Sequence, residues 1–497
     1  MRVVALLAGS LIVLLTEVPA GQRTASPPGP DFSPVREFIK TEMGVGSSTP
    51  SLAVAVARGN EILWEEGFGW IDHPGGTAAT ADTLYYVASV TKAITATALM
   101  VLHERRQVEL DRPANLYLRT AKLRSPHWNA DDVTIRHLAT HTGGLATYDN
   151  RDDIPGNETI RRYGIVFTPP GESFDYSNLG FGILGQIIAD VSGRSFQAFV
   201  HDEVLRPLAM VNAWAGATPK SPHPVAPRYS SQLKTFSPPL TEPRLPGSSV
   251  LYCSAHELAL FGMFHLKVPH PRQQAILSDA AIDGLREPAV AAGERRQSLA
   301  WSITDNQHGY RTLLAQGGTY DSQAWLLLVP SERIVVVVLA NAGNVAVSSA
   351  IDRILSVMLR VYRENLASAV APGSGGTAPA TISPSAVPLE LVGAWSGEIH
   401  THRGNVPLAV AITSSGDVTA TLGKQPPVNM TDVRTRNDRV IGRMHGDLGV
   451  DYVGTAPYQL RFALRRVGNK LVGSAITYAA DLGRLPLWVE LRRGENK

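Results

Sequence analysis

The first residues that could do chemistry are in the tetrapeptide Ser89-Val90-Thr91-Lys92, which opens the apolar run AITATALMVL. On a helix, residues three apart share one face, so the Ser89 hydroxyl and the Lys92 amine can meet. A serine hydroxyl becomes a nucleophile when a neighbouring group accepts its proton, and a lysine can accept it if burial or a nearby charge disfavours its ammonium form. The pair predicts covalent catalysis at a carbonyl carbon. The alternative is a helix N-cap followed by a surface lysine.

A second candidate is Tyr176-Ser177-Asn178, which comes just before another helical pattern. A phenol near a lysine can relay a proton, and an amide side chain can align a substrate carbonyl, whereas the alternative is a buried tyrosine with an ordinary hydrogen bond. Two decoys repeat these spacings. Tyr148 begins a second Y-x-N without a helix behind it, and Ser231 and Lys234 form a second S-x-x-K in a Pro-rich stretch. We therefore prefer Ser89 and Tyr176.

These groups can share a site only if the fold brings distant elements together. Residues 52–58 and 62–68 flank Gly59-Asn60 and predict one hairpin, and 324–329 and 334–340 predict a second, deeply buried one. Helical patterns lie between them at about 90–103, 179–191 and 196–205, and Gly193 is placed to end the middle helix. The prediction is an α+β domain whose antiparallel sheet comes from both ends of the domain, with helices between and around it.

Composition divides the rest of the chain. We expect a hydrolase domain over 35–366, then a Pro/Gly/Ala/Ser linker over 367–388 that has no charged or aromatic side chain. Residues 389–497 show short alternating strands and predict a small all-β barrel or sandwich. The sequence leaves three roles open for this β-domain, which could cover the site, bind a polymer or mediate oligomers.

The N-terminus reads as an export signal. Arg2 precedes the apolar run 3–15 and then Val18-Pro19-Ala20, which predicts a signal peptide over 1–20 with cleavage near Ala20-Gly21. An uncleaved membrane anchor is the alternative, although the run is short for one. Residues 21–34 then form a flexible segment, and the mature protein is expected in the periplasm or outside the cell.

Other partner classes find little support. The 46 Lys+Arg balance 44 Asp+Glu, which gives no electrostatic case for nucleic acid, and a single cysteine excludes an intrachain disulfide. The G-x-G-x-x-G at 180–185 follows no apolar strand, so it predicts close helix packing rather than nucleotide binding. His137 and His141 have the i, i+4 spacing of a zinc-protease helix but lack its glutamate. We expect no metal and no cofactor.

The ordered blocks TLYYVASVTKAITATAL, VTIRHLATHTGGL, PPGESFDYSNLGFGILGQIIADVSG and LLLVPSERIVVVVLAN carry a resemblance over roughly residues 52–366. They resemble the serine β-lactamase and penicillin-binding hydrolase family, on its class C and esterase side. The resemblance implies that Ser89 is acylated and that Lys92 and Tyr176 share the acid/base work. Which of these two accepts the serine proton stays open. It also implies that Asn178 contacts the acyl side of the substrate.

The third motif departs from that family. Gln316-Gly317-Gly318-Thr319 stands where relatives carry Lys-Thr-Gly or His-x-Gly. By position, the backbone N–H groups of Ser89 and Thr319 form the oxyanion hole, and the glycines allow close substrate approach. Gln316 is neutral, so it offers a substrate carboxylate no charge-assisted hydrogen bond. This favours a less charged ester or amide, unless Arg311 or an arginine of the 295–296 pair supplies the charge.

The sequence therefore predicts an exported serine hydrolase that cleaves a small ester or amide through an acyl-enzyme on Ser89. A β-lactamase or D-alanyl-D-alanine carboxypeptidase is the nearest alternative. A cell-wall-binding protein without turnover is the second alternative, although intact Ser89, Lys92 and Tyr176 argue against it. The expected partner is a small-molecule ester, amide or peptide, with cell-wall contact and oligomeric state left open.

Overall fold

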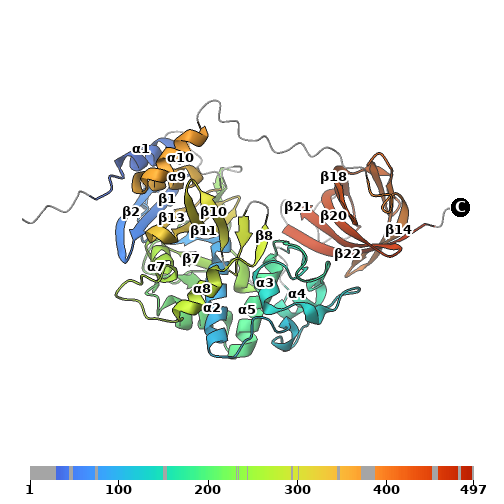
Figure 1. Cartoon of the computed structure of the whole chain (residues 1–497), viewed down its shortest axis with the longest axis horizontal. Coiled ribbons are helices and arrows are strands. Elements are labelled where there is room, and N and C mark those ends of the chain that lie inside the picture. The colour runs from blue at the N-terminus through green and yellow to red at the C-terminus, as the bar shows by residue number, and fades with distance from the viewer. Residues whose placement is uncertain are drawn as a thin grey trace, which may run out of the picture.

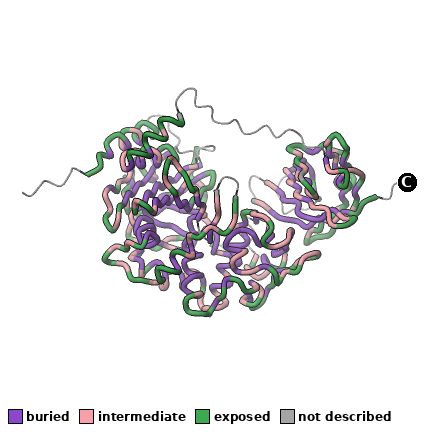
Figure 2. Tube along the Cα trace, in the orientation of Figure 1, coloured by how far each residue is buried: buried purple, intermediate pink, exposed green. Residues whose placement is uncertain are grey.

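The computed structural model describes residues 29–43, 49–72, 76–148, 154–230, 232, 234–242, 244–292, 295–299, 301–343, 347–370, 387–449, 457–479 and 483–494. They form a large α+β domain and a smaller all-β domain, with the buried residues concentrated inside each (Figures 1 and 2). The predicted signal peptide lies outside the described residues. Within these ranges, no helix combines the length and the apolar character needed to cross a membrane.

The large domain is built on one antiparallel sheet of eight strands, and both ends of the domain contribute to it, as the sequence predicted. The N-terminal hairpin β1–β2 pairs through β1 with β13, the last strand of the domain, so the sequence-distant ends meet as the second and third strands of the sheet (Figure 1). In sheet order the strands are β2 (Glu61–Gly69), β1 (Ser51–Arg58), β13 (Ile334–Ala340), β12 (Ser322–Val329), β11 (Tyr310–Thr319), β10 (Ser302–Gln307), β9 (Arg295–Gln297) and β8 (Val290–Ala292).

The sheet is covered on both faces, which explains why β1 and β13 read as continuous apolar runs. In β1, Leu52, Val54 and Val56 belong to one buried cluster, which contains side chains of α1 (Ser33–Glu42) and α9 (Val347–Met358). The alternate residues Ala53, Ala55 and Ala57 belong to the larger central cluster, which includes side chains of α7 (Ala255–His265). The alanines on that face let α7 approach the strands closely.

Helix α2 (Thr91–Glu104) is buried from Thr91 to Leu102. It packs against α5 (Asn178–Ser192), α6 (Phe196–Val200), α8 (Asp279–Arg286) and the π-helical turn η4 (His201–Leu205). Helices α3 (Ile135–Ala139) and α4 (Gly156–Tyr163) pack against α5. Short 3₁₀ turns are η1 (Ala88–Val90), η2 (Ala114–Leu116), η3 (Ala130–Asp132), η5 (Pro246–Ser248) and η6 (Pro330–Glu332). Two small sheets contain β3 (Tyr85–Tyr86), β7 (Leu251–Cys253) and β4 (Trp214–Ala215), and β5 (Tyr229–Ser230) with β6 (Thr235–Phe236).

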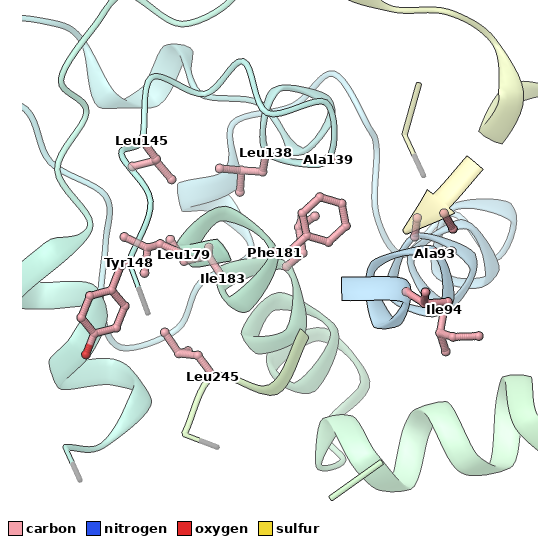
Figure 3. Packing of buried hydrophobic residues seen from close by; sticks show 14 of the residues in the cluster. Ala93, Ile94, Leu138, Ala139, Leu145, Tyr148, Leu179, Phe181, Ile183 and Leu245 are labelled. Atoms are coloured by element: carbon pink, nitrogen blue, oxygen red, sulfur yellow. The ribbon is translucent and has the colours of Figure 1, made fainter. Parts of the chain in front are cut away.

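Helix α5 ends at Gly193, whose φ of 71° is the left-handed conformation that a glycine C-cap supplies. The G-x-G-x-x-G at its start serves packing, as predicted. A Cβ on Gly182 would lie 2.9 Å from Leu245 Cβ, and one on Gly185 would lie 2.7 Å from the Gly247 nitrogen. The apolar side chains of α5 lie between the loop that carries Leu145 and Tyr148 and helix α2 (Figure 3).

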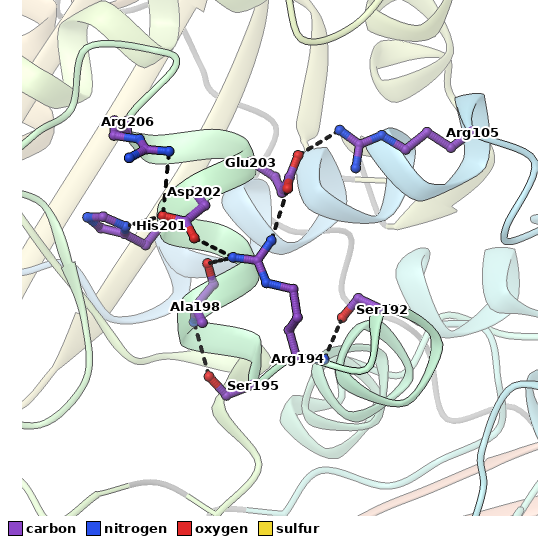
Figure 4. Close-up of polar contacts among 9 residues, drawn as sticks. All are labelled: Arg105, Ser192, Arg194, Ser195, Ala198, His201, Asp202, Glu203 and Arg206. Carbon is purple, nitrogen blue, oxygen red and sulfur yellow. Dashed lines mark hydrogen bonds and ion pairs between the residues drawn. The ribbon is translucent and has the colours of Figure 1, made fainter.

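The pattern at 196–205 forms α6 and η4 in succession, and an arginine network fixes them at the far end of α5. The Arg194 guanidinium pairs with Asp202, donates to Glu203 Oε1 at 3.0 Å and donates to the Ala198 carbonyl at 3.0 Å. Arg105, just after α2, donates to the same Glu203 at 2.6 Å (Figure 4). This network joins the ends of α2 and α5, away from their N-terminal ends.

The C-terminal domain is a nine-stranded antiparallel sheet curved into a barrel-like unit (Figure 1). In sheet order the strands are β17 (Val428–Asn429), β16 (Val418–Leu422), β15 (Gly404–Ile412), β14 (Gly393–Thr401), β22 (Gly483–Arg493), β21 (Lys470–Ala479), β20 (Tyr458–Val467), β19 (Arg439–Gly446) and β18 (Thr431–Arg436). Helix α10 (Arg360–Val370) continues four residues into the predicted linker, and residues 371–386 lie outside the described ranges.

The two domains are in direct contact through an apolar cluster and through ion pairs. Trp488 of β22 stacks on Phe167 with 5.8 Å between ring centroids, and Val472 and Ile165 complete the buried cluster. The loop leading to Tyr176 also contacts the barrel. Its Glu172 carboxylate accepts hydrogen bonds from Arg439 and Arg465 of the β-domain. The β-domain therefore touches the segment that holds a predicted catalytic residue.

Candidate active site

The nucleophile candidate Ser89 lies in the tight turn η1, just before helix α2. The preceding residue Ala88 has a φ of 45°, in the left-handed region that an alanine rarely adopts and that costs about 1–3 kcal/mol. Thr91 Oγ1 holds this turn, because it donates to the Ala88 carbonyl at 2.7 Å and accepts from the Val250 and Leu251 nitrogens at 3.1 Å each. The strained turn leaves the Ser89 side chain half-buried.

Lys92 lies one helical turn after Ser89, as the i, i+3 spacing predicted. Its side chain is buried, and Nζ donates to Ser89 Oγ at 3.0 Å, to Asn178 Oδ1 at 2.8 Å and to the Ser248 carbonyl at 3.0 Å. These three acceptors fix the amine beside the hydroxyl. In the described part of the chain, no carboxylate forms an ion pair with Lys92.

Tyr176 reaches the same hydroxyl from the other side. Its Oη lies 2.8 Å from Ser89 Oγ, and Lys92 Nζ lies 4.9 Å from the centre of its ring. The tyrosine is 41% exposed, so it stands at the mouth of the site rather than in the core. The decoy Tyr148 is buried and stacks on Tyr163, with 4.5 Å between the ring centroids. The structure thus brings Ser89, Lys92 and Tyr176 together and leaves Tyr148 apart.

His141 packs against the ring of Tyr176, a contact that the sequence analysis did not predict. Helix α3 ends at Ala139, so His141 does not lie on the helix with His137, and the zinc-protease spacing does not reflect a shared helix face. Its Nδ1 accepts a hydrogen bond from the Ser177 nitrogen at 3.1 Å, and its ring lies 4.4 Å from that of Tyr176. Burial, with a contribution from the Lys92 charge, lowers the pKa of His141 well below its ordinary value. The imidazole therefore stays neutral and can accept this bond.

The start of α5 positions the asparagine. Ser177 is the N-cap, and its hydroxyl accepts from the Gly180 nitrogen at 3.0 Å and donates to the Ala146 carbonyl at 3.1 Å. Asn178 is then the first residue of the helix and points its Oδ1 at Lys92 Nζ. The geometry gives Asn178 a direct part in holding the lysine, in addition to the substrate contact that the family resemblance implies.

Strand β11 brings the third motif to the nucleophile. A Cβ built on Gly317 would lie 2.1 Å from the Val87 carbonyl oxygen and 2.8 Å from the Ser89 nitrogen, so only glycine fits there. Strand β10 pairs with β11 only as far as Leu314, and η1 lies against the following residues of β11. Gln316 and Gly318 are exposed, and Thr319 comes two residues after Gly317 on the same strand. This places the expected oxyanion donor, the Thr319 N–H, on the strand that touches the Ser89 turn.

Two arginines considered as substitutes for a family lysine are engaged elsewhere. Arg296 pairs with Asp305, and Arg311 Nε lies 3.8 Å from an oxygen of the same Asp305. Arg311 is five residues before Gln316 on an extended strand, about 17 Å away along the chain. The structure therefore does not bring Arg296 or Arg311 to Gln316, and the side chain of Arg295 lies outside the described residues.

The family model described as "Beta-lactamase" matches residues 35–358, well over half of the chain and the full span that holds Ser89, Lys92 and Tyr176. The chain belongs to the β-lactamase family. It has the family's serine hydrolase fold, with a Ser–Lys–Tyr constellation assembled at one point. Among the described residues, no cluster of three histidine, cysteine or acidic side chains could hold a metal ion.

Curated relatives cover this domain at low identity. "Protein flp" of Staphylococcus aureus strain MW2 is 23% identical over 319 residues, 61% of this chain and 62% of the relative. A "Putative penicillin-binding protein PbpX" of Bacillus subtilis is 28% identical over 212 residues, 41% of this chain and 52% of the relative. An "Unguisins hydrolase ungD'" of Aspergillus campestris is 28% identical over 340 residues, 62% of each chain. The chain thus spans between 52% and 62% of the length of these relatives.

Solved structures show the fold more completely. An octameric penicillin-binding protein homologue from Pyrococcus abyssi aligns with a TM-score of 0.58 at 20% identity, covering 92% of this chain and 100% of that one. A class C β-lactamase from Rhodobacter sphaeroides aligns with a TM-score of 0.53 at 19% identity, covering 68% of this chain and 99% of that one. The first match extends beyond the large domain into the β-domain.

Proposed function

We propose that this chain is an exported serine hydrolase that cleaves a small, largely uncharged ester or amide through an acyl-enzyme. The observation that carries the proposal is the placement of one hydroxyl, Ser89 Oγ, 3.0 Å from Lys92 Nζ and 2.8 Å from Tyr176 Oη. A hydroxyl between an amine and a phenol has a route for its proton in both halves of a two-step acyl transfer.

The reaction follows from that placement. Ser89 Oγ attacks the substrate carbonyl, and its proton passes to the Lys92–Tyr176 pair. The N–H groups of Ser89 and Thr319 then stabilise the oxyanion, and removal of one such donor typically costs about 100–1000-fold in rate. As the bond to the leaving alcohol or amine breaks, the pair returns the proton to that leaving group. Water then attacks the acyl-enzyme and gives a proton to the same pair, which passes it to Ser89 Oγ as the bond to the acyl group breaks and the acid is released.

The neutral third motif supports the choice of substrate. Gln316 is exposed on β11 beside the nucleophile, and Arg296 and Arg311 pair with Asp305 instead of approaching it. A substrate carboxylate would thus lose a charge-assisted hydrogen bond, worth roughly 1.5–3 kcal/mol against about 1 kcal/mol for a neutral one. A small neutral acyl donor loses nothing by this substitution.

Export is supported by the sequence of residues 1–20, in which Arg2, an apolar run and Val18-Pro19-Ala20 follow the order of a signal peptide. The nearest alternative activity is that of a β-lactamase or D-alanyl-D-alanine carboxypeptidase. The observation that favours it is fold similarity, because a D-alanine carboxypeptidase from Burkholderia cenocepacia aligns with this chain with a TM-score of 0.53.

The test is a substrate panel with one nucleophile variant. Purified protein is incubated with p-nitrophenyl acetate, benzylpenicillin and a D-alanyl-D-alanine peptide, beside Ser89→Ala. Ester turnover that needs Ser89 and exceeds reaction with the two carboxylate-bearing compounds supports the proposal. Faster reaction with benzylpenicillin or the peptide supports the alternative instead. A wild type and a Ser89→Ala variant with equal, background rates on every compound would refute hydrolysis and leave the cell-wall-binding reading.

A further inference from the structure

The turn that joins β11 to β12 lacks the backbone conformation that usually closes so short a hairpin. Thr319 pairs with Ser322, so only Tyr320 and Asp321 lie between the strands. Two-residue hairpin loops usually need a residue with positive φ, and neither Tyr320 nor Asp321 has one. Side chains hold the turn instead. Thr319 Oγ1 lies 2.6 Å from Asp321 Oδ1 and 2.8 Å from Ser322 Oγ.

Asp321 is the centre of this arrangement and is fully buried. Its second carboxylate oxygen, Oδ2, accepts from Arg228 Nη1 at 2.6 Å, and its backbone carbonyl accepts from the Tyr229 nitrogen at 3.2 Å. The side chain of Arg228 is itself only 11% exposed. Burying a carboxylate costs several kcal/mol unless it is paired and hydrogen-bonded, so the pair with Arg228 is required for Asp321 to stay there.

Arg228 also reaches strand β3, which leads into the turn that carries the nucleophile. Its guanidinium carbon lies 5.8 Å from the ring centre of Tyr86, which is three residues before Ser89, and its Nη2 donates to the Pro238 carbonyl at 2.6 Å. The Tyr86 hydroxyl in turn donates to the Ser249 carbonyl at 2.8 Å, next to the Ser248 carbonyl that accepts from Lys92. Arg228 therefore connects the Thr319 turn with strand β3, which leads into the Ser89 turn.

We propose that Arg228 and Asp321 are positioning residues of the oxyanion hole, which fix the Thr319 N–H relative to the Ser89 N–H. The inference rests on the proposed function for its chemistry, because it assumes that these two N–H groups stabilise the oxyanion. The side-chain bond from Thr319 Oγ1 to Asp321 is the link through which the ion pair acts. Neither residue touches the reacting atoms.

The readout is the rate at which a fluorophosphonate labels Ser89, which requires no natural substrate. Ser89 Oγ attacks phosphorus, fluoride leaves, and the serine proton passes to the Lys92–Tyr176 pair, while charge grows on the phosphoryl oxygen. Intact mass gives the final labelling stoichiometry and the rate separately. A folding defect lowers the stoichiometry, whereas a misplaced donor lowers the rate while the stoichiometry still reaches one.

We expect labelling to slow by about 10–100-fold in each of the variants Arg228→Lys, Asp321→Asn and Thr319→Val. This loss does not exceed the loss in rate caused by removing an oxyanion donor altogether, because the Thr319 N–H is misplaced but still present. Thr319→Ser keeps the hydroxyl, so its labelling rate is expected to stay within about threefold of the wild-type rate, which is the size of effect that an ordinary substitution produces. The double variant Thr319→Val with Arg228→Lys should be no slower than its slower parent, because both changes break one linked unit.

The matched control is Arg194→Lys. Arg194 also bridges two carboxylates and a carbonyl, but it follows the C-terminal end of α5, about 23 Å along the helix from Asn178 (Figure 4). It should label at the wild-type rate. The inference is overturned if the folded Arg228, Asp321 and Thr319→Val variants label like the control, or if the rate losses of Thr319→Val and Arg228→Lys multiply.

Three further outcomes complete the test, and the second of them separates the inference from the proposed function. If Arg228→Lys and Asp321→Asn fail to fold, the difference between Thr319→Val and Thr319→Ser still decides, since equal labelling rates would refute the link. A wild type that is labelled on Ser89 but turns over no ester refutes the proposed function while the labelling series still tests the positioning. A wild type that is not labelled refutes both.

Discussion

Replacing Gly317 by alanine is the most revealing single change near the nucleophile. A Cβ at this position would lie 2.1 Å from the Val87 carbonyl oxygen, 2.8 Å from the Ser89 nitrogen and 3.0 Å from the Val90 nitrogen. All three atoms are backbone atoms of the turn that carries Ser89, so none can swing away as a flexible side chain would. Strand β11 or the turn must therefore move.

The size of the movement gives the expected loss. A carbon and a carbonyl oxygen need at least about 3 Å, so β11 and the Ser89 turn must separate by about 1 Å, and a misplacement of that size can cost about 100-fold in rate. Gly317→Ala should thus lower kcat/KM for an ester by about 100-fold. At the neighbouring Gly318 a Cβ would meet nothing closer than the Ser322 carbonyl oxygen at 3.5 Å, so Gly318→Ala should lose far less.

The assay compares these two variants with Gly284→Ala, where a Cβ would meet nothing within 4 Å. Ester hydrolysis and fluorophosphonate labelling are measured on each, after circular dichroism confirms folding. We expect both rates to be highest in wild type and Gly284→Ala, lower in Gly318→Ala, and by far the lowest in Gly317→Ala. Equal activity of Gly317→Ala and Gly318→Ala would refute the contact between β11 and the Ser89 turn.

Three further changes have defined outcomes. Gln316→Lys should raise the ratio of benzylpenicillin to neutral-ester reactivity by about tenfold, the equivalent of about 1.4 kcal/mol for a new charge-assisted bond; an unchanged ratio in paired rate measurements would contradict it. Arg465→Gln should lower the ester kcat a few-fold, because Arg465 Nη1 donates to Glu172 in the Tyr176 loop at 2.5 Å. The control Arg466→Gln should leave kcat unchanged, because the partner of Arg466 is Glu390, which lies before the barrel. Buried His141 and His265 have pKa values below their ordinary 6.5, so their contribution to stability is intact above that pH and is lost as the pH falls, by up to about 1.4 kcal/mol per unit each. Urea unfolding at pH 7 and pH 5 should show this decline, and a variant His141→Asn with an equally steep decline would argue against a neutral His141.

Local chemistry is what the sequence predicted best. The i, i+3 spacing placed Lys92 beside Ser89, and pairs of apolar runs on either side of turn residues identified both hairpins of the sheet. These features depend on residues close in the chain or on a repeating pattern, so one segment at a time is enough to find them. The family resemblance added the link between Ser89 and Tyr176, which are 87 residues apart.

The features that sequence reasoning missed depend on contacts between distant segments. Nothing in an alanine at position 88 signals a φ of 45°, because glycine is the residue that marks such a turn. The pair of Arg228 with Asp321 joins residues 93 apart, and the Ser248 carbonyl that holds Lys92 is 156 residues away from it. His141 carried a misleading signal, since its spacing from His137 suggests one helix face, but α3 ends before it.

The central claim is that Ser89 is the residue that becomes acylated. The most direct measurement is intact mass spectrometry with peptide mapping after fluorophosphonate treatment of wild type, Ser89→Ala and Ser231→Ala. Ser231 belongs to the second S-x-x-K of the chain and serves as the matched control. The account predicts one adduct on Ser89 in wild type and in Ser231→Ala, and none in Ser89→Ala. An adduct that persists in Ser89→Ala, or that maps to Ser231, would contradict it.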